Sequence, residues 1–205
     1  MSAMKFKDFK YQRPDLSEIK GQFDELLNQL DQARDAEEQT KVLAEINELR
    51  SKFESMEQIT HIRHTVATTD SFYEKEQAFF DENTPVYQGL ISRYYHSLVN
   101  SPFRKELEER WGKQLFVKAD LTLKTFTPEI IEDLQLENKL TSDYTKLLAS
   151  AKILFEGEER NLPGLVPFQM SRDRDIRRQA NEAKYAYFKA NEEILDNIYD
   201  RLVKV

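Results

Sequence analysis

Cysteine is absent from the 205-residue chain, and glycine and proline are sparse, with five and six residues. Without cysteine, disulfides, thiolate metal ligands and a cysteine nucleophile are all excluded. So few glycines and prolines, beside 33% charged residues, favour long helices. No apolar run approaches the length that spans a bilayer, and Met1 to Lys10 lacks the apolar core of a signal peptide. The composition predicts a cytoplasmic protein with no membrane partner.

A surplus of positive charge is also missing. The chain has 30 lysines and arginines against 37 acidic residues, which gives a net charge of −7. Nucleic-acid binding needs clustered basic side chains that neutralise phosphates. The charge balance therefore predicts no nucleic-acid partner.

Motifs of the common hydrolytic sites are absent too. A zinc-peptidase helix carries histidines at i and i+4 with glutamate at i+1, and no segment of the chain has that pattern. There is no G-x-S-x-G nucleophile elbow and no glycine-rich phosphate loop. The residues alone indicate no catalytic, cofactor-binding or metal-binding position in this chain.

Three histidines remain as possible metal ligands: His61, His64 and His96. His61 and His64 are three apart, so on a helix they lie on neighbouring parts of one surface and two contacts to a metal are conceivable. A stable site needs further ligands, and none is marked nearby. Ordinary helix-surface or buried hydrogen-bonding roles are the favoured interpretation.

A cluster of arginines at the start of the last predicted helix is a second feature with two interpretations. Its members are Arg172, Arg174, Arg177 and Arg178. The cluster could bind an anionic partner. Asp173 and Asp175 alternate with the arginines, however, so local ion pairing is favoured.

Apolar stripes at helical spacing fill most of the chain. Pro14 suits a first helical position, before a helix to about Asp31. Capping boxes are predicted at two starts, each with glutamate three residues after the cap. The pairs are Asp35 with Glu38 and Ser71 with Glu74. The first of these helices ends within 65–70, and Pro85 either kinks the second or restarts it.

Three further helices are expected in the middle of the chain. Ser101-Pro102 predicts a helix over 103–119 that runs on towards Leu123, and Thr127-Pro128 repeats the signal. Thr141 predicts the cap of a short helix over 142–150. Phenylalanine and tyrosine are abundant throughout, and core contacts explain them better than a ligand site.

The helical pattern breaks once, near residues 151–165. Ile153 and Phe155 alternate with Lys152 and Leu154, as in a short half-buried strand, and Gly157 can take positive φ in the following turn. Ser171 is then expected to cap one continuous helix whose apolar stripe runs from Ile176 to Leu202. No stop signal follows, so a truncated helix and a longer protein are expected.

Together these patterns predict a mainly α fold, an antiparallel helical array with one small β-hairpin near residues 151–165. Two regions are expected. One is an N-terminal helical region over 4–125, and the other, over 126–205, carries further helices, the hairpin and the long last helix. The alternative is one continuous domain.

Five segments carry a resemblance to a known family. They are Phe6–Pro14, Ile62–Glu76, Phe103–Leu115, Phe126–Lys152 and Ser171–Ala183. Their order and spacing resemble the N-terminal portion of oligoendopeptidase F, in the thimet-oligopeptidase-like family of zinc metallopeptidases. The similarity runs from Met4 over essentially the whole chain.

The resemblance implies a cytoplasmic enzyme that cleaves short peptides with a zinc ion held by a His-Glu-x-x-His helix and a further glutamate. Those residues lie beyond Val205, so this chain alone is expected to be inactive and to hold no zinc. The implied role is one wall of a deep substrate cavity, with the C-terminal catalytic half as partner. Two alternatives stay open: a free-standing helical module that binds proteins or peptides, and a separate metal site at His61 and His64.

Overall fold

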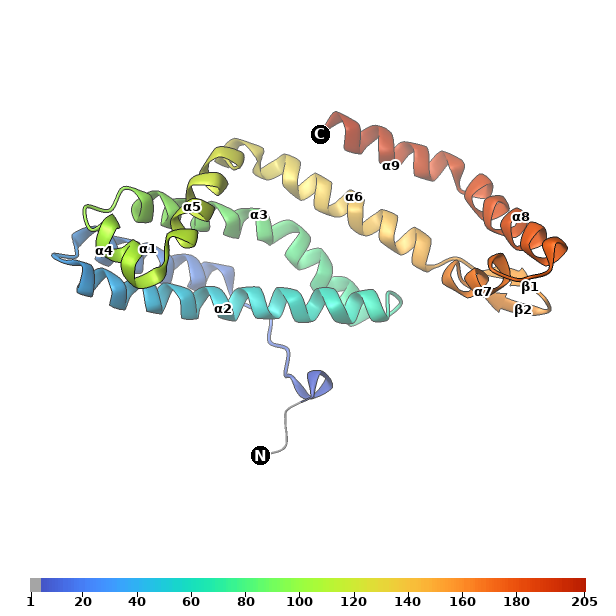
Figure 1. The fold of residues 1–205 in the computed structure, drawn as a ribbon, viewed down its shortest axis with the longest axis horizontal. Coiled ribbons are helices and arrows are strands. Elements are labelled where there is room, and N and C mark those ends of the chain that lie inside the picture. Colours follow the sequence, from blue (N-terminus) through green and yellow to red (C-terminus); the bar gives the residue numbers. More distant parts are fainter. Residues whose placement is uncertain (1–4) are drawn as a thin grey trace. The chain divides into compact units, whose positions relative to one another are not determined.

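A computed structural model describes residues 5–205. Met4, the predicted start of the resemblance, lies outside the described residues. Nine α-helices, three 3₁₀ helices and two strands follow one another in this part of the chain (Figure 1). The order is η1 (Phe6–Asp8), α1 (Leu16–Gln32), α2 (Ala36–Val66), α3 (Ser71–Val99), α4 (Arg104–Trp111), α5 (Lys113–Thr125), η2 (Pro128–Ile130), α6 (Ile131–Ala149), β1 (Ile153–Phe155), β2 (Glu158–Arg160), η3 (Pro163–Leu165), α7 (Val166–Gln169), α8 (Arg174–Ala190) and α9 (Glu192–Lys204). The mainly α fold with one small hairpin is confirmed. No described helix is long and apolar enough to cross a membrane.

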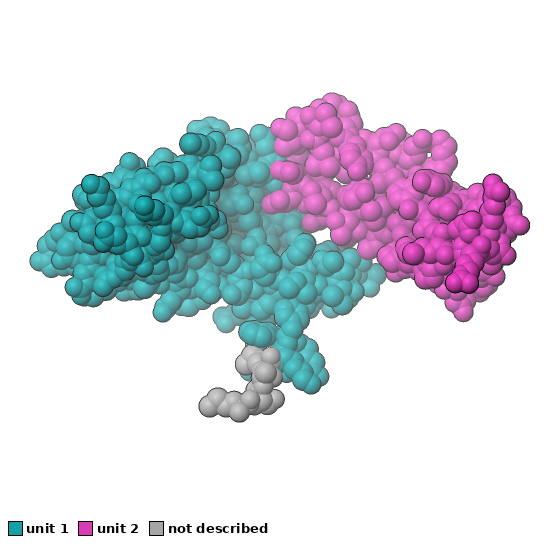
Figure 2. Space-filling view, in the orientation of Figure 1, with its two compact units in different colours: residues 1–135 teal, residues 136–205 magenta. Residues whose placement is uncertain are grey.

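The chain divides into two compact units, residues 1–135 (unit 1) and 136–205 (unit 2), which Figure 2 colours separately. Unit 1 holds α1 to α5. Unit 2 holds the hairpin, α7 to α9 and most of α6. The predicted domain boundary at 125/126 remains a prediction.

Unit 1 is built on α1, α2 and α3, which lie side by side, with α5 packed on α3 (Figure 1). Their facing apolar stripes form one core. At its centre the ring of Phe53 stacks on Tyr87 with centroids 4.0 Å apart, and Phe80 meets Phe53 edge-on at 5.4 Å. Aromatic pairs of this kind contribute about 0.5–1.5 kcal/mol each beyond the burial of their area. The predicted core role of these aromatics is confirmed.

Aspartates cap the helices of unit 1 because a short carboxylate reaches the unpaired N–H groups of the first turn. The predicted cap at Asp35 is confirmed, since its carboxylate accepts from the Glu38 N–H at 2.8 Å. The predicted cap at Ser71 is wrong: Asp70 accepts from the N–H groups of Phe72 and Tyr73 instead. Asp15 likewise caps α1, so Pro14 precedes the cap and is not a helical residue.

The helix α3 continues through Pro85, which settles the alternative left open by the sequence in favour of one helix. Proline has no N–H to donate and disturbs the preceding turn. Side-chain amides bond to carbonyls of that region: Asn83 donates to Phe79 O at 2.7 Å, and Gln135 donates to Glu82 O at 2.6 Å.

Two predicted helix boundaries are wrong. The helix expected over 103–119 is two helices, α4 and α5, because Gly112 adopts φ 85° between them. Glycine takes this conformation without the steric cost that other residues meet. Conversely, Thr141 does not cap a short helix but lies exposed within the continuous α6. A threonine is tolerated there because its side chain faces solvent.

The hairpin of unit 2 has the predicted alternation. Ile153 and Phe155 are buried while Leu154 is exposed. Glu156 and Gly157 form the two-residue loop with φ 53° and 77°, as a type I′ turn requires. The strands pair antiparallel, with Phe155 opposite Glu158. A five-residue cluster packs the hairpin against α8: Ala151, Ile153, Phe155, Leu165 and Ala180.

The single long helix expected after Ser171 is wrong in two respects. Asp173, not Ser171, caps α8 by accepting from the N–H groups of Asp175 and Ile176. The helix then breaks at Asn191, whose side-chain amide donates to Tyr187 O at 2.8 Å. Asparagine competes in this way with the regular backbone bonds of a helix. The predicted apolar stripe is therefore divided between α8 and α9.

Candidate functional site

The two histidines that are three residues apart lie in different surroundings. His61 is exposed on α2, whereas His64 is buried. His96 is exposed on α3. Across residues 5–205 there is no group of three or more histidine, cysteine, aspartate or glutamate side chains placed to hold a metal ion. The described residues therefore offer no set of ligands that fits a zinc ion.

The arginine cluster shows the local pairing that its sequence favours. Arg178 lies 3.3 Å from carboxylates of both Asp175 and Glu182. Arg177 donates to the backbone carbonyl of Ser171 at 2.6 Å. These contacts stabilise the start of α8, and they use two of the four arginines for structure.

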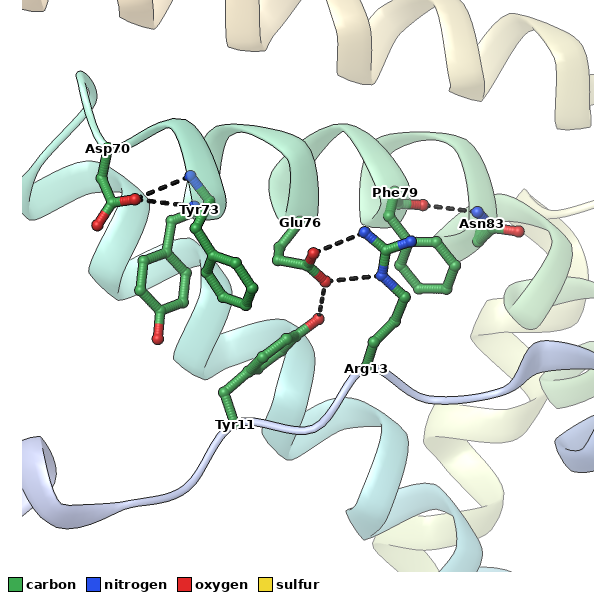
Figure 3. A network of polar contacts seen from close by, with 8 residues as sticks. Tyr11, Arg13, Asp70, Tyr73, Glu76, Phe79 and Asn83 are labelled. Atoms are coloured by element: carbon green, nitrogen blue, oxygen red, sulfur yellow. Dashed lines mark hydrogen bonds and ion pairs between the residues drawn. The ribbon is translucent and has the colours of Figure 1, made fainter.

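The most elaborate polar site in unit 1 joins the N-terminal segment to α3 (Figure 3). Arg13 binds the Glu76 carboxylate with two parallel bonds, from Nε at 2.8 Å and from Nη2 at 2.6 Å. The Tyr11 hydroxyl donates to the same carboxylate at 2.5 Å. The guanidinium of Arg13 also lies 4.8 Å from the ring centroid of Phe79. Bidentate pairs of this geometry are among the strongest polar contacts in proteins.

The electrostatics of this site follow from burial and pairing. Glu76 is only 4% exposed, and the side chain of Arg13 is 49% exposed. The Arg13 guanidinium lowers the pKa of the Glu76 carboxyl below its usual 4.5. Burial, together with the bond to Glu76, raises the pKa of the Tyr11 hydroxyl. Glu76 is therefore held ionised and Tyr11 protonated, so neither is prepared to exchange a proton near neutral pH.

A second arginine secures the same segment. Arg63 on α2 donates to Phe9 O at 2.6 Å and to the Tyr73 hydroxyl at 2.5 Å. Its guanidinium also lies 5.6 Å from the ring centroid of Phe6. Residues 5–15 are thus tied to α2 and α3 by two arginines, although only one short 3₁₀ helix forms within them.

Sequence reasoning missed this site. Phe6–Pro14 and Ile62–Glu76 entered only as segments that carry a resemblance, and nothing in their spacing pairs Arg13 with Glu76. The signal was indirect, since a buried glutamate on a helix needs a cationic partner from elsewhere in the chain. A periodicity analysis marks such a glutamate as a solvent-facing residue.

Unit 1 also contains a pocket of about 790 Å³ between α1, α3, α5 and residues 126–129. Leu16, Leu90, Leu123 and Phe126 give it apolar walls. Its polar lining includes Lys20, Arg93 and His96. Arg93 is already paired with Asp24 at 2.5 Å. The pocket can accommodate an apolar group, but it has no nucleophile–base pair that would act on one.

Comparison with known proteins shows the family to which this chain belongs. The sequence model of the Peptidase M3 N-terminal domain matches residues 6–126. The chain belongs to the peptidase M3 family. The resemblance predicted from the sequence is thereby confirmed, and the matched region contains every residue of the Tyr11–Arg13–Glu76 site.

Solved structures of M3 relatives superpose on nearly all of this M3 chain. A PZ peptidase A with an inhibitor is 55% identical, with a TM-score of 0.95 over 98% of this chain and 36% of its own. A protein assigned as oligoendopeptidase F from Bacillus anthracis is 52% identical, with a TM-score of 0.96 over 100% of this chain and 38% of its own. Another protein assigned as oligoendopeptidase F is 53% identical, with a TM-score of 0.96 over 98% of this chain and 36% of its own. A comparison with curated protein sequences finds no match.

This M3 chain therefore spans little more than a third of the length of the structures that it matches. The rest of each relative has no counterpart in these 205 residues. Both units follow the relatives closely, since the superpositions cover 98–100% of the chain.

Proposed function

We propose that this chain is the non-catalytic, N-terminal, cavity-forming portion of a cytoplasmic zinc endopeptidase that hydrolyses short peptides. One observation carries the proposal. The chain matches an M3 N-terminal domain and superposes on about a third of peptidases that are 52–55% identical to it. In this proposal the zinc ligands and the general base belong to the remaining part of the protein.

The polar sites described above support a structural role. Tyr11, Arg13 and Glu76 satisfy one another, and their protonation states are held away from the exchange that a general acid or base needs. In this proposal the packed helices of unit 1, with residues 5–15 fastened to α3 by this site, make a rigid wall. Such a wall would admit extended peptides and exclude folded proteins, which are wider than an extended chain.

Membership of a peptidase family favours this proposal over a free-standing interaction module. A module of that kind would bind peptides or partner helices by itself. The wall would contribute to peptide cleavage only together with the catalytic part.

The test compares the chain alone with a chimera. In the chimera, the chain replaces the matched 38% of the Bacillus anthracis relative. Both are assayed with a quenched-fluorescent short peptide and added zinc, and with a folded protein as a second substrate. We expect zinc-dependent cleavage of the peptide by the chimera only, and no cleavage of the folded protein.

Two results would contradict the proposal. Zinc-dependent cleavage by the chain alone would show that it holds a catalytic site. Failure of the chimera to cleave any short peptide, while the parent relative cleaves it under the same conditions, would show that this chain does not form a working cavity.

A further inference from the structure

Unit 2 buries little apolar surface for its size. Apart from the five-residue cluster around the hairpin, the apolar side chains buried in residues 136–205 are Leu140 on α6 and Ile198 on α9. A helix is stabilised mainly by packing its apolar face against other elements. The pair α6 and α9 therefore lacks the core that would normally hold two helices of this length.

A groove of about 840 Å³ lies between these two helices. Its apolar lining is formed by Leu140 and Leu147 on α6 and by Ile194 and Ile198 on α9. Charged residues of both signs edge it, including Asp143, Lys146, Glu193 and Arg201. An apolar floor between charged edges is the form of a groove that receives an amphipathic helix.

Exposed apolar residues also lie on a second side of α9. Ile194, at the groove, is 53% exposed, and Val203 is 84% exposed. At about 100° per residue, Ile194 and Val203 lie on roughly opposite sides of the helix. Apolar residues thus cover more of α9 than α6 alone can bury, which is typical of a helix with partners on two sides.

We infer that the α6–α9 groove is a docking surface for an amphipathic helix from the part of the M3 protein that lies outside the match, and that further residues of that same part cover the opposite side of α9. This rests on the proposed function. The relatives carry 62–64% of their length outside the match, which is ample to provide such a helix. A large apolar surface at this place is expected if further polypeptide covers it.

The test uses one substitution in two settings, the isolated chain and the chimera with the Bacillus anthracis relative. Ile194→Asp places a charge at the groove. We expect it to leave the thermal midpoint of the isolated chain within about 1 °C, because the side chain is half exposed there. In the chimera it should lower the midpoint by about 5 °C or more and speed proteolysis, because the charge would be buried without a partner.

Two variants serve as controls. Ile194→Val keeps an apolar side chain and should behave as the unmodified chimera does. Asp200→Ala alters an exposed position of α9 that pairs with Lys204 and does not line the groove, so it should change neither protein appreciably. Val203→Asp probes the outer surface of α9 and should repeat the effect of Ile194→Asp in the chimera.

Equal midpoint shifts for Ile194→Asp in both settings would overturn the inference. So would sedimentation of the isolated chain as a dimer that Ile194→Asp dissociates, because a second copy would then occupy the groove. These readouts do not depend on catalysis. An inactive chimera that still shows the selective destabilisation would contradict the proposed function and leave the docking surface supported.

Discussion

Units 1 and 2 differ in how much apolar surface they bury. Unit 1 contains 20 of the 27 buried apolar side chains of the described residues, and unit 2 contains 7, although unit 1 is less than twice as long. Each unit exposes eight large apolar side chains among the described residues. Unit 1 therefore has a continuous aromatic core, whereas unit 2 buries less apolar surface and carries the groove for which we propose a docking partner.

The largest expected effect tests the core of unit 1. Phe53→Ala should lower the free energy of unfolding by about 3–5 kcal/mol, because it removes a fully buried ring that contacts both Tyr87 and Phe80. Urea unfolding followed by circular dichroism measures the change. The matched variant in unit 2 is Leu154→Ala, at a side chain that is 77% exposed, and it should change stability by less than about 0.5 kcal/mol. Similar losses for both would remove the contrast between the units.

The next effect concerns the attachment of residues 5–15. Arg13→Ala should lower the free energy of unfolding by about 1–3 kcal/mol, since the buried Glu76 carboxylate keeps its bond from the Tyr11 hydroxyl but loses its cationic partner. The same urea experiment measures it. Arg178→Ala in unit 2 is the control, because that exposed arginine pairs only at the surface and should destabilise the chain much less than Arg13→Ala does. An equal cost for the two arginines would contradict the role given to Glu76.

The third prediction concerns how the stability of unit 1 depends on pH through the Arg13–Glu76 pair. Arg13 lowers the pKa of Glu76 in the folded chain below its usual 4.5, so the pair's contribution is complete above about pH 4.5. It is lost as the pH falls through the folded pKa, because the protonated carboxyl no longer pairs with the guanidinium. Thermal midpoints measured from pH 7 to pH 3 should therefore fall more steeply for the unmodified chain than for Glu76→Gln. Parallel curves for the two proteins would show that the Arg13–Glu76 pair makes no pH-dependent contribution to stability.

The smallest effects contrast one glycine from each unit. Gly21→Ala on α1 should raise stability by about 0.5–1 kcal/mol, because alanine favours helix and an added Cβ meets nothing within 4 Å. Gly157→Ala in the hairpin turn should lower it by about 1–2 kcal/mol, because alanine is strained at φ 77°. Opposite signs in thermal unfolding are the expected result. A stabilising Gly157→Ala would contradict the type I′ turn.

Much of the fold could be predicted because helices and hairpins depend on near neighbours in the sequence. The stripe of α1, the cap at Asp35 and the positive φ at Gly157 are local features. The errors lie where two local signals compete. Asp70 displaced Ser71 as a cap because both can accept from first-turn N–H groups, and Asn191 interrupted a stripe that periodicity alone would continue.

The polar site of unit 1 could not be predicted, because Arg13 and Glu76 are 63 positions apart in the chain. Nothing in either segment encodes that distance. The different surroundings of His61 and His64 could not be predicted for a related reason. Spacing places His61 and His64 on adjacent parts of α2, but the packing of neighbouring helices buries one and leaves the other exposed.

Composition and local pattern were enough to predict a mainly helical chain with one hairpin, and the resemblance carried by five segments indicated its family. They act through short-range physics: helix propensity, capping and turn geometry need only adjacent residues. The burial of Glu76 beneath Arg13, the open groove between α6 and α9, and the unequal cores of the two units depend on contacts between distant segments. Only the tertiary structure decides which distant segments meet, so these features could not be predicted from neighbouring residues.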